Sequence, residues 1–286
     1  MAVTIGNNIA SLTAQRRLGS STEKLQSTYE KLSSGQRINK ASDDAAGLAI
    51  ADSLRADSRI AQVAIRNAND GISVTNIADS ALGEIGNVLT RMAELAEQSA
   101  NGVLSVTQRS ALATEFGALA SEIERIAVTT TFNGVNLLSG GASIAFQVGF
   151  DSQSTSQISY NGVQGTLAAL GLASSGSSSL NFSINASTAA AGQSASVNAL
   201  DAVKAAINSL TSTRGTLGAA STRLSVAINN LTVARENFLS AESRIRDVDV
   251  AAEAAELTRL TILQQAGAAV LTQANQQPTL ALSLLS

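Results

Sequence analysis

The 286-residue sequence contains no histidine, no cysteine and no tryptophan, and its only proline is Pro278. Without histidine or cysteine the chain has no Ser-His-Asp triad, no thiol nucleophile and no zinc site of the usual ligand set. Carboxylates alone can support catalysis, so this composition argues against an enzyme without excluding one. We expect a protein that is not an enzyme and that holds no cofactor. Because disulfides are also impossible, the redox compartment stays undefined.

Aromatic residues are equally scarce, at 3%, whereas hydrophobic residues make up 44% of the chain. The core must therefore consist of Ala, Leu, Ile and Val, and small aliphatic side chains favour long helices that approach one another closely. No proline interrupts such helices before Pro278. With a net charge of −3, no basic stripe and few stacking aromatics, we expect no nucleic-acid partner.

Charged residues are absent from both ends of the chain, since none precedes Arg16 and none follows Arg259. The C-terminal run has an apolar stripe opposite amides and hydroxyls, and its Gln and Asn residues interrupt any membrane-spanning length. The N-terminus lacks the basic and apolar regions of a secretory signal. We expect these terminal helices to be disordered in the monomer and to be covered by other copies on assembly. Their expected packing positions are Ile5, Ile9, Leu12, Leu260, Leu263, Val270 and Leu271.

A heptad repeat marks the segment from Leu200 to Phe238 and predicts one continuous helix with a coiled-coil seam, roughly 60 Å long. The seam positions are Val203, Leu210, Leu217, Leu224, Leu231 and Phe238. The interleaved positions are half apolar and half polar: Leu200, Ile207, Arg214, Ser221, Ile228 and Arg235. These polar entries favour a multi-helix bundle or an inter-subunit contact over a simple dimer, and we expect the seam to serve assembly.

Further helices are predicted over residues 43–100 and 107–128, and an N-terminal helix should end at Ser33-Ser34-Gly35. Asp43 is a candidate N-cap for the first of these. Asp247 and Asp249 indicate a hinge and an N-cap at the start of the terminal helix, which we favour over a metal site.

The segment between Ile126 and Leu200 carries only one charge, Asp151. Within it, residues 131–134 (Thr-Phe-Asn-Gly) indicate a turn, and apolar residues alternate from Ile144 to Phe150, which is typical of a short hairpin. We expect residues 131–198 to form a β-hairpin and a Ser/Gly-rich surface insert. The predicted fold class is mainly α: an elongated antiparallel helical rod or coiled-coil bundle with a small β-hairpin insert and paired N- and C-terminal helices.

Several segments of the sequence carry a specific family resemblance. The first is LSSGQRINKASDDAAGLAIA at residues 32–51, followed by residues 68–73, 94–96 and 132–138, with residues 242–251 and 273–278 at the far end. In order and spacing they resemble the N- and C-terminal signatures of bacterial flagellins. The resemblance covers nearly the whole chain except about residues 150–198, and it indicates a short form without large outer domains.

The resemblance implies a secreted structural subunit that self-assembles into the extracellular flagellar filament for swimming. Residues 1–42 and 250–286 would form the inner-tube domain, and residues 43–249 the rod-like outer-tube domain. Export would be in an unfolded state through the flagellar type III apparatus. The implied partners are other copies of the chain, the flagellar cap, hook-associated proteins and an export chaperone.

Arg91, Leu95 and Glu115 stand where flagellins recognised by toll-like receptor five carry their contact residues. Ala93 and Glu97 depart from the strongest receptor-binding pattern. The same three residues could instead be subunit contacts or part of a solvated face, and the two interpretations are compatible.

Two other functions stay open at this point. A hook–filament junction protein resembles flagellin at both ends, and a secreted type III translocator would use its C-terminal helix on membranes. The absence of Lys and Arg from the polar face of that helix argues against membrane binding.

Overall fold

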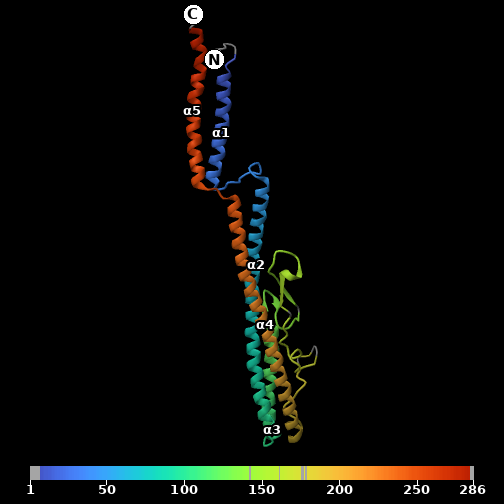
Figure 1. Cartoon of the computed structure of the whole chain (residues 1–286). Helices are drawn as coiled ribbons and strands as arrows, with labels where there is room; N and C mark the ends of the chain where they lie inside the picture. Colours follow the sequence, from blue (N-terminus) through green and yellow to red (C-terminus); the bar gives the residue numbers. More distant parts are fainter. Residues whose placement is uncertain (1–6, 142, 161, 175–176, 178, 284–286) are drawn as a thin grey trace. The chain divides into compact units, whose positions relative to one another are not determined.

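The computed structural model describes residues 7–141, 143–160, 162–174, 177 and 179–283, with side chains up to residue 277. The α-helices in this part of the chain are α1 (Ile9–Ser34), α2 (Ala45–Ser99), α3 (Val106–Thr129), α4 (Ala189–Arg246) and α5 (Val250–Ser283) (Figure 1). The strands form two antiparallel pairs, β1 (Thr131–Phe132) with β2 (Val135–Asn136) and β3 (Ile144–Gln147) with β4 (Gln157–Tyr160). A 3-10 turn, η1 (Ser154–Ser156), precedes β4. The mainly α fold class is confirmed.

The two longest helices follow from uninterrupted helix-forming sequence. α2 has 55 residues and α4 has 58, which at 1.5 Å per residue gives lengths of about 80 and 90 Å. α4 begins eleven residues before the heptad repeat. In this first part the buried residues are the small Gly192, Ser196 and Ala199, which produce no apolar repeat in the sequence. α3 begins at a capping box in which Ser105 and Gln108 satisfy each other's backbone N–H groups.

The chain divides into two compact units, residues 1–58 with 236–286 and residues 59–235. The division falls inside α2 and α4. The assignment of residues 1–42 with 250–286 and of residues 43–249 to inner- and outer-tube domains stays a prediction.

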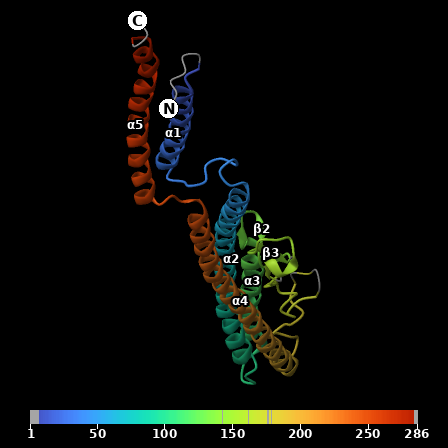
Figure 2. The same cartoon turned by 45° about the horizontal axis from the view of Figure 1, so that its top comes forward.

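In the first unit α1 and α5 lie side by side and antiparallel, as both views show (Figures 1 and 2). The Asn8 amide donates to the Ala274 carbonyl at 2.8 Å, and Ser11 Oγ donates to Asn275 Oδ1 at 2.6 Å. Gly267 allows close approach, because a Cβ there would lie 3.3 Å from Leu18 Cδ1. α1 ends at Gly35, which adopts the left-handed conformation (φ 70°) of a helix C-cap. The predicted pairing of the terminal helices is confirmed.

The expected packing positions of these helices are covered only in part within one chain, and their burial by other copies stays a prediction. Leu260 is buried and Leu271 is half-buried, but Ile9, Leu12, Leu263 and Val270 are exposed. Ile5 lies outside the described residues. The contact within the chain instead uses small and polar residues such as Ser11, Thr28 and Ala274. An apolar stripe predicts that a face is buried, but it does not say which surface covers that face.

In the second unit α3 and α4 both run antiparallel to α2, because Arg109 near the start of α3 joins the end of α2 to the start of α4. The core of this bundle lies along α2. The expected assembly seam is corrected here, because five of its six residues are buried inside this bundle: Val203, Leu210, Leu217, Leu224 and Leu231. Phe238 belongs to the first unit and is half-buried. The seam is therefore used within one chain, since a heptad pattern is the same for intramolecular and intermolecular burial.

The segment between α3 and α4 supplies part of the core, although its Ser/Gly-rich composition predicts a surface position. Leu138, Leu167, Leu172 and Ile184 are completely buried and belong to the same core as the helices. Glu124 of α3 anchors this segment by accepting the Leu167 backbone N–H at 3.1 Å. The predicted hairpin corresponds to β3 and β4, and Asn133 (φ 49°) with Gly134 (φ 76°) forms the tight turn between β1 and β2.

Candidate assembly and recognition surfaces

Two chain segments run antiparallel at the start of the connection between α1 and α2. Gln36 forms a β-bridge with Asp247, and the Val248 N–H donates to the Gly35 carbonyl at 3.1 Å. The Arg37 N–H donates to the Arg246 carbonyl at 2.6 Å. Backbone pairing therefore ties the segment that leaves α1 to the segment that enters α5.

Arginine side chains reinforce this pairing. Arg246 donates through Nε to Gln36 Oε1 at 3.1 Å and lies 3.4 Å from the Asp52 carboxylate. The Arg37 guanidinium donates to the Ile245 carbonyl at 2.7 Å, near the C-terminal end of α4, where a positive charge is favoured.

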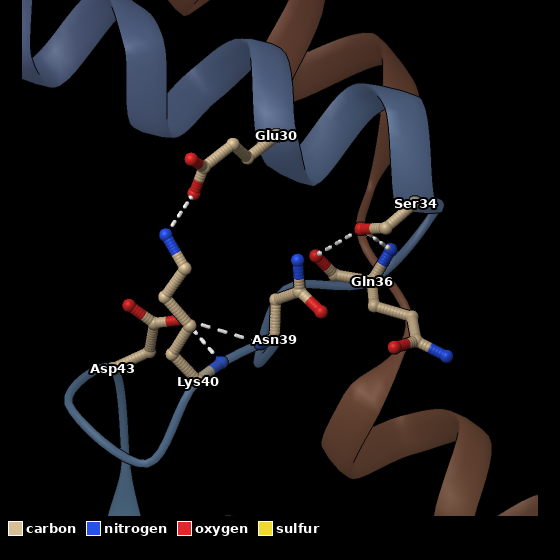
Figure 3. Close-up of polar contacts among 6 residues, drawn as sticks. All are labelled: Glu30, Ser34, Gln36, Asn39, Lys40 and Asp43. Carbon is tan, nitrogen blue, oxygen red and sulfur yellow. Dashed lines mark hydrogen bonds and ion pairs between the residues drawn. The ribbon is translucent and has the colours of Figure 1, made fainter.

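Asp43 organises the loop that follows this bridge. Its Oδ2 accepts the backbone N–H groups of Lys40 at 2.9 Å and Asn39 at 3.1 Å (Figure 3), and these bonds lower the pKa of the Asp43 carboxyl group. Lys40 Nζ pairs with Glu30 at 2.6 Å, and this hydrogen bond raises the pKa of Lys40 (Figure 3). Asp43 is therefore not the N-cap of α2. That position belongs to Asp44, whose Oδ1 accepts the Gly47 N–H at 2.9 Å.

Asp249 occupies the N-cap of α5, where its Oδ1 accepts the N–H groups of Ala251 at 3.0 Å and Ala252 at 3.1 Å. Asp247 takes part in the bridge to Gln36 through its backbone. The two aspartates thus have different structural roles at the connection between α4 and α5.

α1 and α5 expose a set of large apolar side chains, here called the terminal stripe. Ile9 is 69% exposed and Val270 is 57% exposed. The other members are Leu12, Ile262 and Leu263. Arg17 lines the same surface groove as Leu263 and Val270, but no charged residue precedes Arg16 or follows Arg259. Large apolar side chains gathered on the exposed faces of one helix pair mark a protein contact.

Arg91 and Glu115 join α2 to α3 on an exposed face of the second unit. Arg91 donates through Nε and Nη2 to Glu115 Oε1, at 3.0 and 2.9 Å, and through Nη1 to Glu94 at 2.9 Å. These hydrogen bonds raise the pKa of Arg91. Leu95 does not share this face, because it is 1% exposed and lies in the core. Leu95 is corrected from a contact residue to a core residue.

Sequence reasoning missed Arg109, whose side chain is only 1% exposed. Its guanidinium donates to three main-chain carbonyls, those of Ser99 at 2.9 Å, Asn101 at 2.8 Å and Ala189 at 3.0 Å. It thereby joins the end of α2, the turn before α3 and the start of α4. No sequence signal separates this arginine from the solvent-exposed arginines of the chain.

Two other kinds of site are absent from the described residues. No group of three or more acidic residues there could hold a metal ion. Likewise, no helix over the described ranges is long and apolar enough to cross a membrane.

Comparison with known proteins identifies the family of the chain. Residues 5–143 match the bacterial flagellin N-terminal helical region, and residues 200–285 match the bacterial flagellin C-terminal helical region. The flagellin of Halalkalibacterium halodurans is 42% identical over 281 residues, which cover 98% of this chain and 99% of the relative.

Two more relatives show the same coverage, 98% of this chain and 99% of their own length. They are the flagellin of Bacillus subtilis, at 40% identity over 306 residues, and the flagellar filament 33 kDa core protein of Treponema phagedenis, at 39% over 292 residues. Full-length matches of this kind do not favour a junction protein or a translocator. Flagellins are structural proteins and not enzymes, and this chain belongs to the bacterial flagellin family.

Proposed function

We propose that this flagellin, a structural subunit that polymerises into the extracellular flagellar filament, assembles through the terminal stripe on α1 and α5. The observation that carries the proposal is the exposure of Ile9, Leu12 and Val270 on a helix pair that has no charged residue before Arg16 or after Arg259. Burying one such side chain contributes about 1.5–3 kcal/mol. Repetition of one heterologous contact that does not close generates an open helical filament.

The same stripe supports the inner-tube assignment of residues 1–42 and 250–286. A free chain lacks a cover for it, so this helix pair should order fully only when neighbouring copies bury it. The bundle of the second unit buries its own seam and should fold without neighbours. Residues 43–249 would then form the outer tube.

Matched valine substitutions test the proposal. Val270→Ser removes a member of the stripe, whereas Val103→Ser changes an 84% exposed valine on the turn between α2 and α3. Seeded polymerisation of purified monomer, followed by light scattering and negative-stain microscopy, should show a higher critical concentration for Val270→Ser only. Equal polymerisation of both variants and the parent chain would contradict the role of the stripe.

A truncated chain provides a stronger version of the test. A chain lacking residues 260–286 loses Ile262, Leu263 and Val270 together and should not form filaments under any seeding condition. Its second unit should keep its helical circular dichroism, because that unit does not include the deleted residues.

We also infer that the partners needed before and during assembly recognise α5. The apolar side chains it exposes would bind an export chaperone during type III export, and later the flagellar cap and hook-associated proteins. Titration of the chaperone against the Ile262→Ser chain should give weaker binding than against the Val103→Ser chain. Equal affinities would place the contact elsewhere.

For recognition by toll-like receptor five, we propose that Arg91 and Glu115 form the centre of the contact, with Leu95 acting only through packing. The support is that the first two side chains are exposed and paired, as a receptor contact requires. Arg91→Ala should weaken binding to the receptor ectodomain. Arg125→Ala is the control, because Arg125 forms a similar exposed pair with Glu122. Equal binding by the two variants would refute the assignment.

A further inference from the structure

The turn between α2 and α3 contains the dipeptide Asn101-Gly102 at the surface. In such a pair the backbone nitrogen of glycine can attack the asparagine side-chain amide, because no Cβ shields that nitrogen. The chain has two other pairs of this kind, Asn133-Gly134 and Asn161-Gly162. Asn161 lies outside the described residues, so Asn133 serves as the structural comparison.

Asn101 is arranged for this reaction. Its Oδ1 accepts the Val103 N–H at 3.2 Å, and this bond holds the side chain over the backbone that follows Asn101. The same N–H would stabilise the oxyanion that forms when Cγ is attacked. Among the described residues, no acceptor engages the Gly102 N–H.

Asn133 has the opposite arrangement. It sits in the left-handed region (φ 49°) with Gly134 (φ 76°), and the paired strands β1 and β2 hold both ends of the turn. Attack on its side chain requires rotation about the asparagine backbone, which this two-residue turn resists. The reaction at Asn133 must therefore wait for local opening of the ribbon.

The surroundings of Asn101 also favour one of the two possible products of this reaction, isoaspartate over aspartate. The Asn101 main-chain oxygen accepts from Arg109 Nη2 at 2.8 Å and from the Leu104 N–H at 3.3 Å. Arg109 is buried and, within the described residues, has main-chain carbonyls but no carboxylate as partners. In isoaspartate that same main-chain carbonyl becomes a free carboxylate, and a buried guanidinium is better paired by a carboxylate than by a carbonyl.

We propose that Asn101 is a site of spontaneous deamidation in the folded protein and that isoaspartate, paired with Arg109, is the dominant product. The Gly102 nitrogen bonds to Asn101 Cγ and the Cγ–Nδ2 bond breaks. The proton from Gly102 leaves with Nδ2 as ammonia, which gives a succinimide. Water then opens the ring at either carbonyl, and opening at the former main-chain carbonyl yields isoaspartate.

The test compares native and urea-unfolded protein aged in the same buffer and analysed by peptide mapping at acidic pH. In unfolded chains Asn101 and Asn133 should react at similar rates. In native protein Asn101 should react at least about tenfold faster than Asn133, the equivalent of about 1.4 kcal/mol in barrier. The isoaspartate-to-aspartate ratio at residue 101 should also be higher in native than in unfolded protein.

Gly102→Ala is the matched control, since a Cβ at Gly102 would meet only the Gln193 side chain at an ordinary 3.7 Å. This variant should fold normally and lose most of the modification at Asn101. The proposal is overturned if folding slows the reaction at Asn101 as much as at Asn133, or if Gly102→Ala deamidates as fast as the parent. An unchanged product ratio would overturn the role of Arg109.

Discussion

Arg109 Nε donates to the main-chain oxygen of Ser99, the last residue of α2, at 2.9 Å. A cation at the C-terminal end of a helix is electrostatically favourable, and this one is also fully desolvated. Arg109→Met would remove three hydrogen bonds made by a buried guanidinium and should lower the free energy of unfolding by about 3 kcal/mol. Urea unfolding of the monomer measures the loss.

Arg109→Lys provides the graded control. A single ammonium cannot reach all three carbonyls with the geometry of a guanidinium, so its stability should fall between those of the parent and the Met variant. A Met variant as stable as the parent would mean that water satisfies these carbonyls equally well.

Two glycines of α2 should respond in opposite ways to alanine. At Gly71 a new Cβ would lie 3.1 Å from both Phe146 and Leu224, and we expect Gly71→Ala to lose about 1 kcal/mol through overpacking. At Gly83 nothing lies within 4 Å, so Gly83→Ala should gain up to about 1 kcal/mol from helix propensity. Thermal unfolding followed by circular dichroism should order the chains as Gly83→Ala, parent, Gly71→Ala. A destabilised Gly83→Ala would contradict the open space assigned to that position.

Asp79 and Arg214 connect α2 to α4 through two hydrogen bonds, at 2.7 and 3.1 Å. The hydrogen bond from Arg214 lowers the pKa of Asp79, so the folded state binds the Asp79 proton more weakly than the unfolded state does. The pair therefore stabilises the fold above the unfolded pKa of about 3.9. This contribution disappears as the pH falls through the folded pKa.

Because both side chains are exposed to solvent, Asp79→Asn should cost only about 0.5 kcal/mol at pH 7. The difference from the parent should vanish in acid, which urea unfolding at a series of pH values would detect. A difference that persists or grows in acid would show that the carboxylate charge is not responsible.

Tyr160 gives the chain an alkaline dependence of the opposite kind. Burial raises the pKa of Tyr160 to about 12, and its hydroxyl donates to the Leu137 carbonyl at 3.3 Å. Between the unfolded pKa of about 10 and this value, the unfolded state loses the proton first. The free energy of unfolding should therefore fall as the pH rises through that window.

Tyr160→Phe removes this titration but loses the hydrogen bond, at a cost of about 1 kcal/mol at neutral pH. Its stability should decline less steeply than that of the parent above pH 10. Parallel declines in the two proteins would mean that other groups cause the alkaline dependence.

The long helices and the seam could be predicted because their signal is periodic. Leu210, Leu217 and Leu224 repeat every seven residues, and each is buried as the pattern requires. The partner of that seam could not be predicted, because α2 of the same chain and a helix of another chain present equivalent apolar faces. Burial within one chain was decided by the antiparallel return of α4 along α2.

The segment from residue 131 to 198 was harder to predict for a related reason. Leu167, Leu172 and Ile184 stand alone among Ser, Gly and Asn, so no period indicates that they reach the core. Asp43 and Asp44 are adjacent in the sequence, and the exact first residue of α2 determines which of them is its N-cap. The sequence around Arg109 does not indicate burial. Its role follows from its position where the end of α2, the turn before α3 and the start of α4 meet.

The terminal stripe has a thermodynamic consequence for the whole protein. A face that only another copy can cover makes the stability of α1 and α5 depend on mass action, whereas the bundle around α2 carries its own stability. A melting curve of dilute protein would thus measure the stability of the bundle and not the stability that α1 and α5 gain when other copies cover the stripe. Subunit concentration belongs beside temperature and pH among the variables that decide how much of this chain is folded.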